Sequence, residues 1–316
     1  MFAICIESSH QRGMGHLFRA LNLISQLRKM GIDFFVVINN DTVAIGKLKE
    51  WNIPFEIAAL EDVASNWETT LIKKHQVQVW VNDRLETSIT HSKHVKENSI
   101  SLVSIDDIGE GATFADINFI MMPCFYESHG KGLKVLKGLE YFILNDEVSK
   151  YRRIRSELRS VVVSLGGSDT YGVTMKIAKS LIRKKIKATI VIGPSFIFEK
   201  ELLLIAENHF QIKQDVPSLL AEFNQHDMAI TGGGITPFEA NASGLPCIII
   251  ASEQHEIENG KFLEKQGSSI FAGYYSEFDY DSLFDRQFEI GKMSIAGTQI
   301  LNANGAQNVI NEIMKL

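Results

Sequence analysis

The sequence predicts an α/β protein with two domains, each built on a parallel β-sheet. Short apolar runs of strand length alternate with amphipathic segments of helix length almost from the first residue. Parallel strands that are covered on both faces give apolar runs of this kind. The chain has 316 residues, which suits two domains of roughly 150 residues each. We therefore expect an N-terminal domain over 1–150 and a C-terminal domain over 151–316, joined by the polar and basic stretch at 145–158.

The first domain opens with the apolar strand MFAICIE, which is followed by an amphipathic helix. In that helix Leu17, Ala20 and Ile24 recur at helical spacing, and Gly31 closes the helix. The later strands of this domain end in acidic or amide residues, so polar side chains gather at their carboxyl ends. The predicted strands cover 1–7, 33–39, 77–83 and 100–106, and the predicted helices cover 17–31 and 42–51.

The second domain repeats this alternation from residue 160 onwards. Its predicted strands cover 160–167, 187–193, 226–234 and 245–252, and its predicted helices cover 172–185, 216–225, 236–244 and 257–267. Ligands of such domains bind beyond the carboxyl ends of the strands. In a protein with two domains of this type, those ends can face one another across a central cleft. The glycine-bearing strand ends are therefore the places where function is expected.

The net charge, the cysteine spacing and the length of the apolar runs argue against several classes of function. A net charge of -6 argues against a nucleic-acid partner, so an anionic substrate would have to be held by local dipoles and a few cations. Cys5, Cys124 and Cys247 lie far apart with no C-x-x-C pair, which predicts a reducing compartment without a disulfide framework or zinc site. No apolar run approaches the ~18 residues of a spanning helix, and no signal-peptide pattern is present. We expect a cytoplasmic protein with no membrane span, metal or cofactor.

The segment RGMGH, which ends at His16, joins the first strand to the first helix. Gly13 and Gly15 suit a tight turn, but a turn does not require a histidine. At a helix N-terminus the helix dipole disfavours the imidazolium cation, which leaves a neutral imidazole able to accept a proton. His16 is therefore either a capping or core residue, or a general base that activates water.

Two glycine turns follow strands of the second domain. The segment SLGGSDT places Gly166 and Gly167 after a strand, with Ser168 and Asp169 as possible caps of the next helix. Glycine lets the backbone approach a ligand closely, and a helix N-terminus offers unpaired N–H groups to a diphosphate. The spacing matches neither a P-loop nor a dinucleotide-binding motif, and a purely structural turn is the alternative interpretation.

The second turn, ITGGGITPFEA, has a similar position after a later strand. Its candidate substrate-binding residues are Gly232, Gly233, Gly234, Ile235 and Thr236, with Thr236 also the expected helix cap. Glu239 falls in the first helical turn, where a carboxylate either stabilises the helix dipole or accepts hydrogen bonds from a ribose diol.

Polar residues also crowd the start of the helix after the last clear strand. Gln254, His255, Glu256 and Asn259 lie there, and such crowding is typical of capping and solvation. The amide of Asn259 could instead reach a phosphate or a sugar hydroxyl. In the first domain Asp106 and Asp107 end a strand, but nothing in the pattern requires a metal.

Together these motifs resemble the UDP-sugar hydrolases of pseudaminic acid synthesis, which act on UDP-2,4-diacetamido-2,4,6-trideoxy-β-L-altropyranose. The shared segments include GMGHLFRALNLISQL, VNDRLE, GLEYFILNDEV, VVVSLGGSDT and ITGGGITPFEANASGLPCIII, and they agree best over 159–267. That family is similar to the GT-B glycosyltransferases, including the lipid-linked GlcNAc transferase of peptidoglycan synthesis. The resemblance implies two Rossmann-like domains whose parallel sheets face a central cleft, with UDP held mainly by the second domain.

The resemblance also implies roles for single residues. His16 would activate water to attack C1 of the sugar with inversion, and Asp83 matches an aspartate of the cleft. Glu239 matches the acidic residue on the uridine ribose, and Asn259 the amide beside the sugar diphosphate. The departing UDP would be met by the glycine turns of the second domain. The implied substrate contacts are Gly13, Gly15, Gly166, Gly167, Ser168, Gly232, Gly233, Gly234, Ile235, Thr236, Glu239, Gln254 and Asn259.

This chain departs from the family pattern where the sugar would lie. Leu85 stands where an aromatic residue is common, and Asn145 where an arginine is usual. The preferred hypothesis is therefore a metal-independent hydrolase of a UDP-linked amino or deoxy sugar, in bacterial surface-glycan synthesis, with the sugar and the oligomeric state left open. The alternatives are a GT-B glycosyltransferase, in which His16 deprotonates an acceptor hydroxyl, and a nucleotide-sugar-binding protein without turnover.

Overall fold

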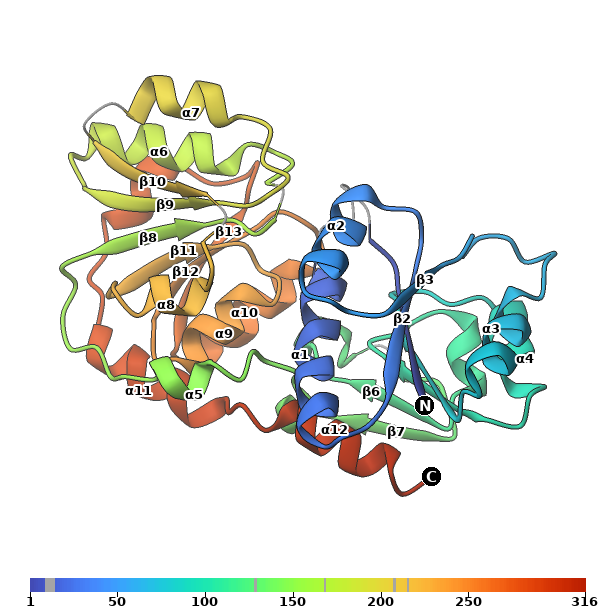
Figure 1. The fold of residues 1–316 in the computed structure, drawn as a ribbon. Helices are drawn as coiled ribbons and strands as arrows, with labels where there is room; N and C mark the ends of the chain where they lie inside the picture. Colours follow the sequence, from blue (N-terminus) through green and yellow to red (C-terminus); the bar gives the residue numbers. More distant parts are fainter. Residues whose placement is uncertain (9–14, 128–129, 168, 207–208, 215) are drawn as a thin grey trace. The chain divides into compact units, whose positions relative to one another are not determined.

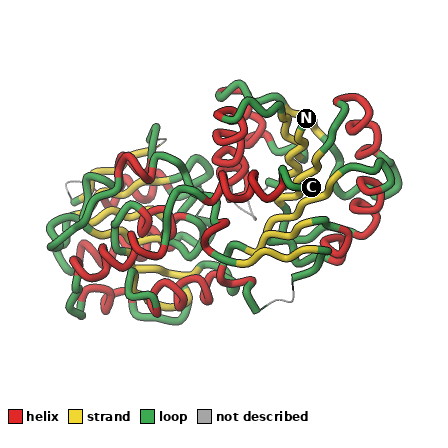
Figure 2. Tube along the Cα trace, turned by 90° about the horizontal axis from the view of Figure 1, so that it is seen from below, coloured by secondary structure: helices red, strands yellow, loops and turns green. Residues whose placement is uncertain are grey.

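The computed structural model divides the chain into two compact units, which are described separately here. It describes residues 1–8, 15–127, 130–167, 169–206, 209–214 and 216–316. Unit 1 consists of Met1–Ile143 and Asn304–Leu316, and unit 2 of Leu144–Ala303. Both termini therefore belong to unit 1, where they lie near each other (Figures 1 and 2).

Unit 1 contains a parallel sheet with the strand order β3-β2-β1-β4-β5-β6-β7. The strands are β1 (Phe2–Ile6), β2 (Phe34–Ile38), β3 (Phe55–Ile57), β4 (Val79–Asp83), β5 (Ser101–Ile105), β6 (Ile117–Ile120) and β7 (Lys134–Lys137). The central strands are buried almost throughout, as expected for a parallel sheet covered on both faces. The four strands predicted for this domain are confirmed, whereas β3, β6 and β7 were not predicted.

Helices cover both faces of this sheet. They are α1 (Gly15–Lys29), α2 (Thr42–Glu50), α3 (Trp67–His75), α4 (Ile89–Lys96) and α12 (Gly305–Ile313). Figure 1 shows α1 and α2 on one side of the strands and α3 and α4 on the other. The crossover helices change sides where the chain passes from β3 to β4, as in a Rossmann fold.

The last helix, α12, packs within unit 1, although the predicted boundary at residue 150 assigned it to the second domain. Val309 and Ile310 are fully buried on its apolar face. Gly305, at its first position, has no room for a side chain, because a Cβ would lie 1.9 Å from the carbonyl oxygen of Phe142. The apolar face of α12 and this close approach hold the chain end on unit 1.

Unit 2 contains a second parallel sheet with the strand order β10-β9-β8-β11-β12-β13. Its strands are β8 (Val161–Ser164), β9 (Ala188–Ile192), β10 (Phe210–Gln214), β11 (Met228–Thr231), β12 (Cys247–Ala251) and β13 (Ser269–Tyr274). Its helices are α5 (Val148–Tyr151), α6 (Val173–Arg183), α7 (Glu199–Ala206), α8 (Leu219–Phe223), α9 (Thr236–Ala242), α10 (Glu256–Lys265) and α11 (Ile290–Ile300). Figure 1 shows α6 and α7 on one side of the strands and α8, α9 and α10 on the other.

Both units are therefore Rossmann-like, as the sequence predicts. In each sheet the strand order reverses beside the first strand of the unit: between β1 and β4 in unit 1, and between β8 and β11 in unit 2. Such a switch point is the place where open α/β sheets bind ligands. Over the described part of the chain, no helix combines the length and apolar character needed to cross a bilayer.

Candidate active site

His16 and Asp83 meet at the switch point of the first sheet. His16 is the second residue of α1, the helix that follows β1, and Asp83 is the last residue of β4. Because β1 and β4 are paired in parallel with Ile6 opposite Asp83, the two connections leave the sheet side by side. Sequence reasoning named both residues as catalytic, and the structure brings them into contact.

The contact is a hydrogen bond between His16 Nδ1 and Asp83 Oδ1, at 2.7 Å. Asp83 is almost fully buried, whereas 19% of the His16 side chain is exposed. An ionised carboxylate can only accept a hydrogen bond, so Nδ1 of His16 carries the proton that is donated to Asp83. Nε2 is then the basic nitrogen of the ring. A carboxylate that fixes the tautomer in this way prepares a histidine to accept a proton.

Arg19 joins this pair, and sequence reasoning missed it. Its Nε donates to both carboxylate oxygens of Asp83, at 3.2 and 3.0 Å, and its Nη2 donates to Oδ1 at 2.5 Å. Its Nη1 donates to Oδ2 of Asp106, the residue after β5. Arg19 is only 3% exposed. Its place three residues after His16 was the available signal, because side chains at that spacing share a helix face.

The charges of this cluster explain its protonation states. Burial acts to raise the pKa of Asp83, but the charge of Arg19 and the interactions and hydrogen bonds with His16 and Arg19 outweigh burial and lower the pKa to about 2. Burial dominates at Asp106 and raises its pKa, although Arg19 and the amides of Met121 and Met122 act in the opposite direction. Burial acts to lower the pKa of Arg19, and the two carboxylates more than compensate. Asp83 therefore stays ionised at neutral pH.

Asp107 has a different role from its neighbour. Its carboxylate accepts from the backbone N–H groups of Thr87 and Gly109, at 3.1 and 2.9 Å, and from the hydroxyls of Thr87 and Ser104. Asp107 thus joins the loop that contains Thr87 to the loop that contains Gly109. Of the two aspartates that end this strand, only Asp106 contacts the cluster around Arg19.

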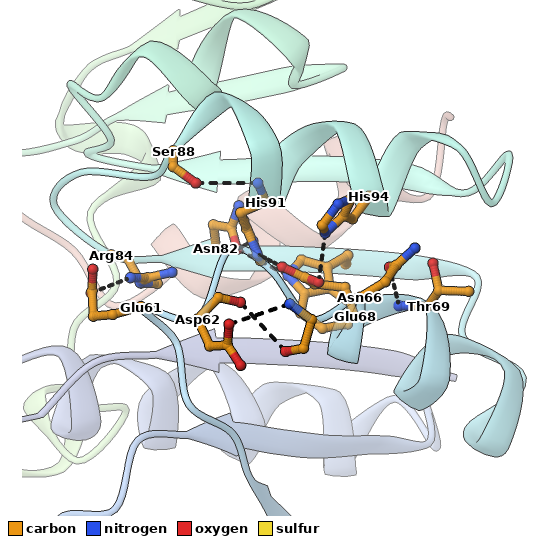
Figure 3. A network of polar contacts seen from close by, with 12 residues as sticks. Glu61, Asp62, Asn66, Glu68, Thr69, Asn82, Arg84, Ser88, His91 and His94 are labelled. Carbon is orange, nitrogen blue, oxygen red and sulfur yellow. Dashed lines mark hydrogen bonds and ion pairs between the residues drawn. The ribbon is translucent and has the colours of Figure 1, made fainter.

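A second polar network, shown in Figure 3, lies between the sheet and helices α3 and α4. Buried Glu68 accepts from Nδ1 of His91 at 2.9 Å and from Nδ1 of His94 at 3.0 Å. The other ring nitrogen of His91 contacts Oδ1 of Asn82, which also accepts from Trp80. Burial lowers the pKa of His91. This network holds Asn82, the residue next to Asp83, in place. It therefore stabilises the end of β4 and is not part of the candidate active site itself.

An open pocket of about 380 Å³ lies at the carboxyl ends of β1, β2 and β3 in unit 1. It is lined by Glu7, Asn39, Asn40 and the stretch 57–61. The lining combines carboxylates and amides with apolar groups, a mixture that suits a polar ligand with apolar faces.

The first glycine turn of unit 2 lies at the switch point of the second sheet. Gly166, just after β8, has a φ of 85°, a conformation that strongly favours glycine. Asp169 satisfies the start of α6, because its carboxylate accepts from the N–H groups of Val173 and Thr174 at 2.8 and 2.7 Å, although Gly172 occupies the capping position. Those two amides are therefore already paired. Gly13 and Ser168 lie outside the described residues.

The second glycine turn follows β11, the neighbour of β8. Gly233 must lack a side chain, because a Cβ there would lie 2.6 Å from Cβ of Glu256. Nδ2 of Asn259 donates to the carbonyl oxygen of Gly233 at 2.9 Å, and Asn259 is fully buried. Asn259 therefore stabilises the turn through its hydrogen bond to Gly233. Its contact with a sugar diphosphate stays a prediction.

The expected cap of the helix after this turn was wrong. Thr236 is the first residue of α9, and Ile235 takes the capping position without any side-chain hydrogen bond to the helix. Thr236 is thus the first helical residue rather than the cap, and Pro237 follows it in the first turn, where its missing N–H costs no intrahelical hydrogen bond. Glu239 Oε1 accepts from the backbone N–H of Asn145 at 3.1 Å, which ties α9 to the segment leading into unit 2. Gln254 is exposed beyond β12.

Among the residues that the structure describes, no group of three or more histidine, cysteine, aspartate or glutamate side chains could hold a metal ion. The free thiols Cys5 and Cys247 are buried, and burial raises the pKa of each to about 12. These cysteines therefore stay protonated and act as core residues.

The two Rossmann-like units define the class of the fold, which is that of the GT-B proteins. Three solved structures agree with this over nearly all of both chains. MurG from Acinetobacter baumannii has a TM-score of 0.73 at 14% identity and covers 100% of this chain and 99% of its own. HepE from Anabaena, in complex with UDP and glucose, has a TM-score of 0.64 at 12% identity and covers 99% of both chains. A glycosyltransferase from Rickettsia africae has a TM-score of 0.62 at 11% identity, with coverage of 99% and 97%.

Two curated proteins are similar in sequence. The uncharacterised protein MJ1062 of Methanocaldococcus jannaschii is 24% identical over 81% of this chain, which spans only 56% of that protein. The spore coat polysaccharide biosynthesis protein SpsG of Bacillus subtilis is 23% identical over 85% of this chain and 83% of its own length. No protein-family model matches the chain. Neither relative is described as a hydrolase, so the hydrolase activity implied by the family resemblance stays a prediction.

Proposed function

We propose that this protein is a glycosyltransferase that moves a sugar from a UDP-sugar to a hydroxyl acceptor during the synthesis of a surface glycan. The observation that carries the proposal is the His16–Asp83 pair at the switch point of the first sheet, a general base with one nitrogen fixed and the other basic. In the transfer, the acceptor hydroxyl gives its proton to Nε2 of His16 while its oxygen bonds to C1 of the sugar. The bond from C1 to the diphosphate oxygen breaks, and UDP leaves with the electron pair.

The second unit supports the nucleotide part of the proposal. Its two glycine turns lie at the switch point between β8 and β11, where a ligand phosphate could approach the backbone closely. HepE, which has the same fold, binds UDP and glucose, and SpsG takes part in polysaccharide synthesis. We carry these properties over to this chain as part of the proposal, with Glu239 as the partner of the ribose.

A hydrolase is the second candidate, because the motifs around His16 and the glycine turns resemble those of UDP-sugar hydrolases. Water would then replace the hydroxyl acceptor at the same base. We rank the transferase first because proteins of the same fold include a glycosyltransferase from Rickettsia africae, and because neither curated relative is described as a hydrolase.

The test is UDP release from a panel of UDP-sugars, including UDP-GlcNAc and UDP-diacetamido-trideoxy-hexoses, with and without monosaccharides and short oligosaccharides as acceptors. A transferase releases UDP faster with one acceptor and increases the mass of that acceptor by one sugar. Equal release without acceptor, with a free sugar as product, identifies the hydrolase instead. Failure to bind UDP in calorimetry overturns both candidates.

A further inference from the structure

The buried side chains next to His16 include two carboxylates, Asp83 and Asp106, although Asp83 alone suffices to orient the imidazole of His16. Arg19 lies between Asp83 and Asp106 and donates to both. We propose that Asp106 is a positioning residue that acts through Arg19: it balances the arginine charge, so that the charge of Asp83 remains available to stabilise the imidazolium of His16. This inference rests on the proposed function, in which His16 accepts a proton.

The net charge of Asp83, Arg19 and Asp106 explains why Asp106 favours a protonated His16. Asp83 and Arg19 alone would form a neutral pair, and a proton on His16 would then leave one uncompensated positive charge. Both oxygens of Asp106 accept hydrogen bonds, one from Arg19 and one from two backbone amides, which is the pattern of an ionised carboxylate. The three buried side chains then carry a net charge of one negative unit, and a proton on His16 makes the cluster neutral. Charges interact strongly in such a buried site, because water screens them poorly. Asp106 therefore favours the protonated state through which His16 must pass.

Hydrogen bonds from the backbone orient the carboxylate of Asp106 towards Arg19. Oδ1 accepts from the N–H groups of Met121 and Met122, at 2.8 and 3.1 Å, which leaves Oδ2 for Arg19. Asp106 also has a φ of 49°, in the left-handed region that glycine, asparagine and aspartate enter more easily than other residues. An aspartate held in this conformation by two amides and one guanidinium has little freedom to turn away.

Two groups near Asp106 do not take over its role. Tyr126 lies near Asp106, and burial followed by the charge of Asp106 raises its pKa, so its hydroxyl stays neutral. The carboxylate of Asp107 is directed at Thr87, Ser104 and Gly109. Hydrogen bonds link His16 to Asp83 from β4, and Arg19 from α1 links Asp83 to Asp106 at the end of β5.

The test compares Asp106→Asn with Asp107→Asn, a matched change at the next buried carboxylate. Asparagine has nearly the same volume and tolerates a positive φ, so the first variant removes the charge and little else. The imidazole of His16 is titrated by NMR in labelled protein, with its signal assigned from His16→Ala. We expect the midpoint in Asp106→Asn to move to lower pH by about one unit, and the midpoint in Asp107→Asn to stay in place.

Kinetics provide the second readout. In Asp106→Asn we expect kcat to fall about tenfold with KM within about threefold of wild type, and the acid limb of kcat/KM to move to lower pH. Asp106→Glu, which restores the charge, should return the acid limb to its wild-type position. If Asp106→Asn does not fold, Asp106→Gly replaces it, because glycine also removes the charge and adopts a φ of 49° without strain.

The outcomes separate this inference from the proposed function. A midpoint in Asp106→Asn equal to wild type, or an equal shift in Asp107→Asn, overturns the role of Asp106 whatever the enzyme does. Activity that survives in His16→Ala overturns the proposed base instead. The NMR titration needs no turnover, so it tests Asp106 even where no donor sugar reacts.

Discussion

At the scale of single residues, the site depends on which buried groups keep their charge. Asp83 is 1% exposed but stays ionised because Arg19 and His16 compensate it. Because these partners lower its pKa, ionised Asp83 stabilises the folded state relative to the protonated form, and the loss of its partners would leave an expensive unpaired charge. The protonation of Asp83 is therefore linked to folding as well as to the orientation of His16.

Asp83→Asn should destabilise unit 1 by roughly 2–3 kcal/mol at about pH 6. The folded-state pKa of Asp83, about 2, lies below its ordinary value of 3.8. The stabilisation is therefore fully present above about pH 4 and is lost as the pH falls towards 2. Urea unfolding of both proteins from about pH 2 to pH 6 measures it. A difference between the two proteins that stays constant over this range would contradict the assignment.

At the scale of secondary-structure elements, the periodic patterns in the sequence predicted the strands and helices that lie next to the site. Strand β1, helix α1, strand β4 and both glycine turns follow from apolar runs and the residues that end them. The contact of His16 with Asp83 could not be predicted from spacing alone, because it depends on β4 pairing with β1. Arg19 was missed because helical periodicity assigns the inward face to apolar residues, whereas here a buried cation occupies it.

The second glycine turn offers a test of close packing between elements. Gly233→Ala should lower the stability of unit 2 by roughly 1–3 kcal/mol, because the new methyl group would contact Glu256 at the start of α10. Gly232→Ala is the matched control, since a Cβ there has no neighbour within 4 Å. We expect its effect to stay within about 0.5 kcal/mol. Calorimetric unfolding of both variants measures the difference, and equal stabilities would show that the turn is not shaped by Glu256.

At the scale of the whole molecule, the chain forms two Rossmann-like units and returns to the first with its last helix. The two alternating series and the polar stretch between them sufficed to predict two such domains. The return of α12 could not be predicted, because an amphipathic helix at a chain end gives no sign of which sheet it will join. Its partner is determined by the fit of its apolar face to unit 1 and by Gly305 against Phe142.

Deletion of residues 304–316 should therefore weaken unit 1 and leave unit 2 intact. The loss of buried side chains such as Val309 and Ile310 removes several kcal/mol of apolar burial. Hydrogen exchange should accelerate in α1, which packs against α12, and stay unchanged in α6 and α9. Uniform acceleration in both units, or none in α1, would contradict this assignment.

The central claim is that His16 is the general base of a reaction on a UDP-sugar. The most direct measurement compares His16→Ala with wild type for UDP release from a reactive donor and, separately, for UDP affinity by calorimetry. We predict that kcat falls at least about 100-fold while the Kd for UDP stays within about threefold, because a general base contributes roughly 10²–10⁴ to the rate. Turnover that survives the substitution would contradict the claim and return His16 to the role of a residue that shapes the start of α1.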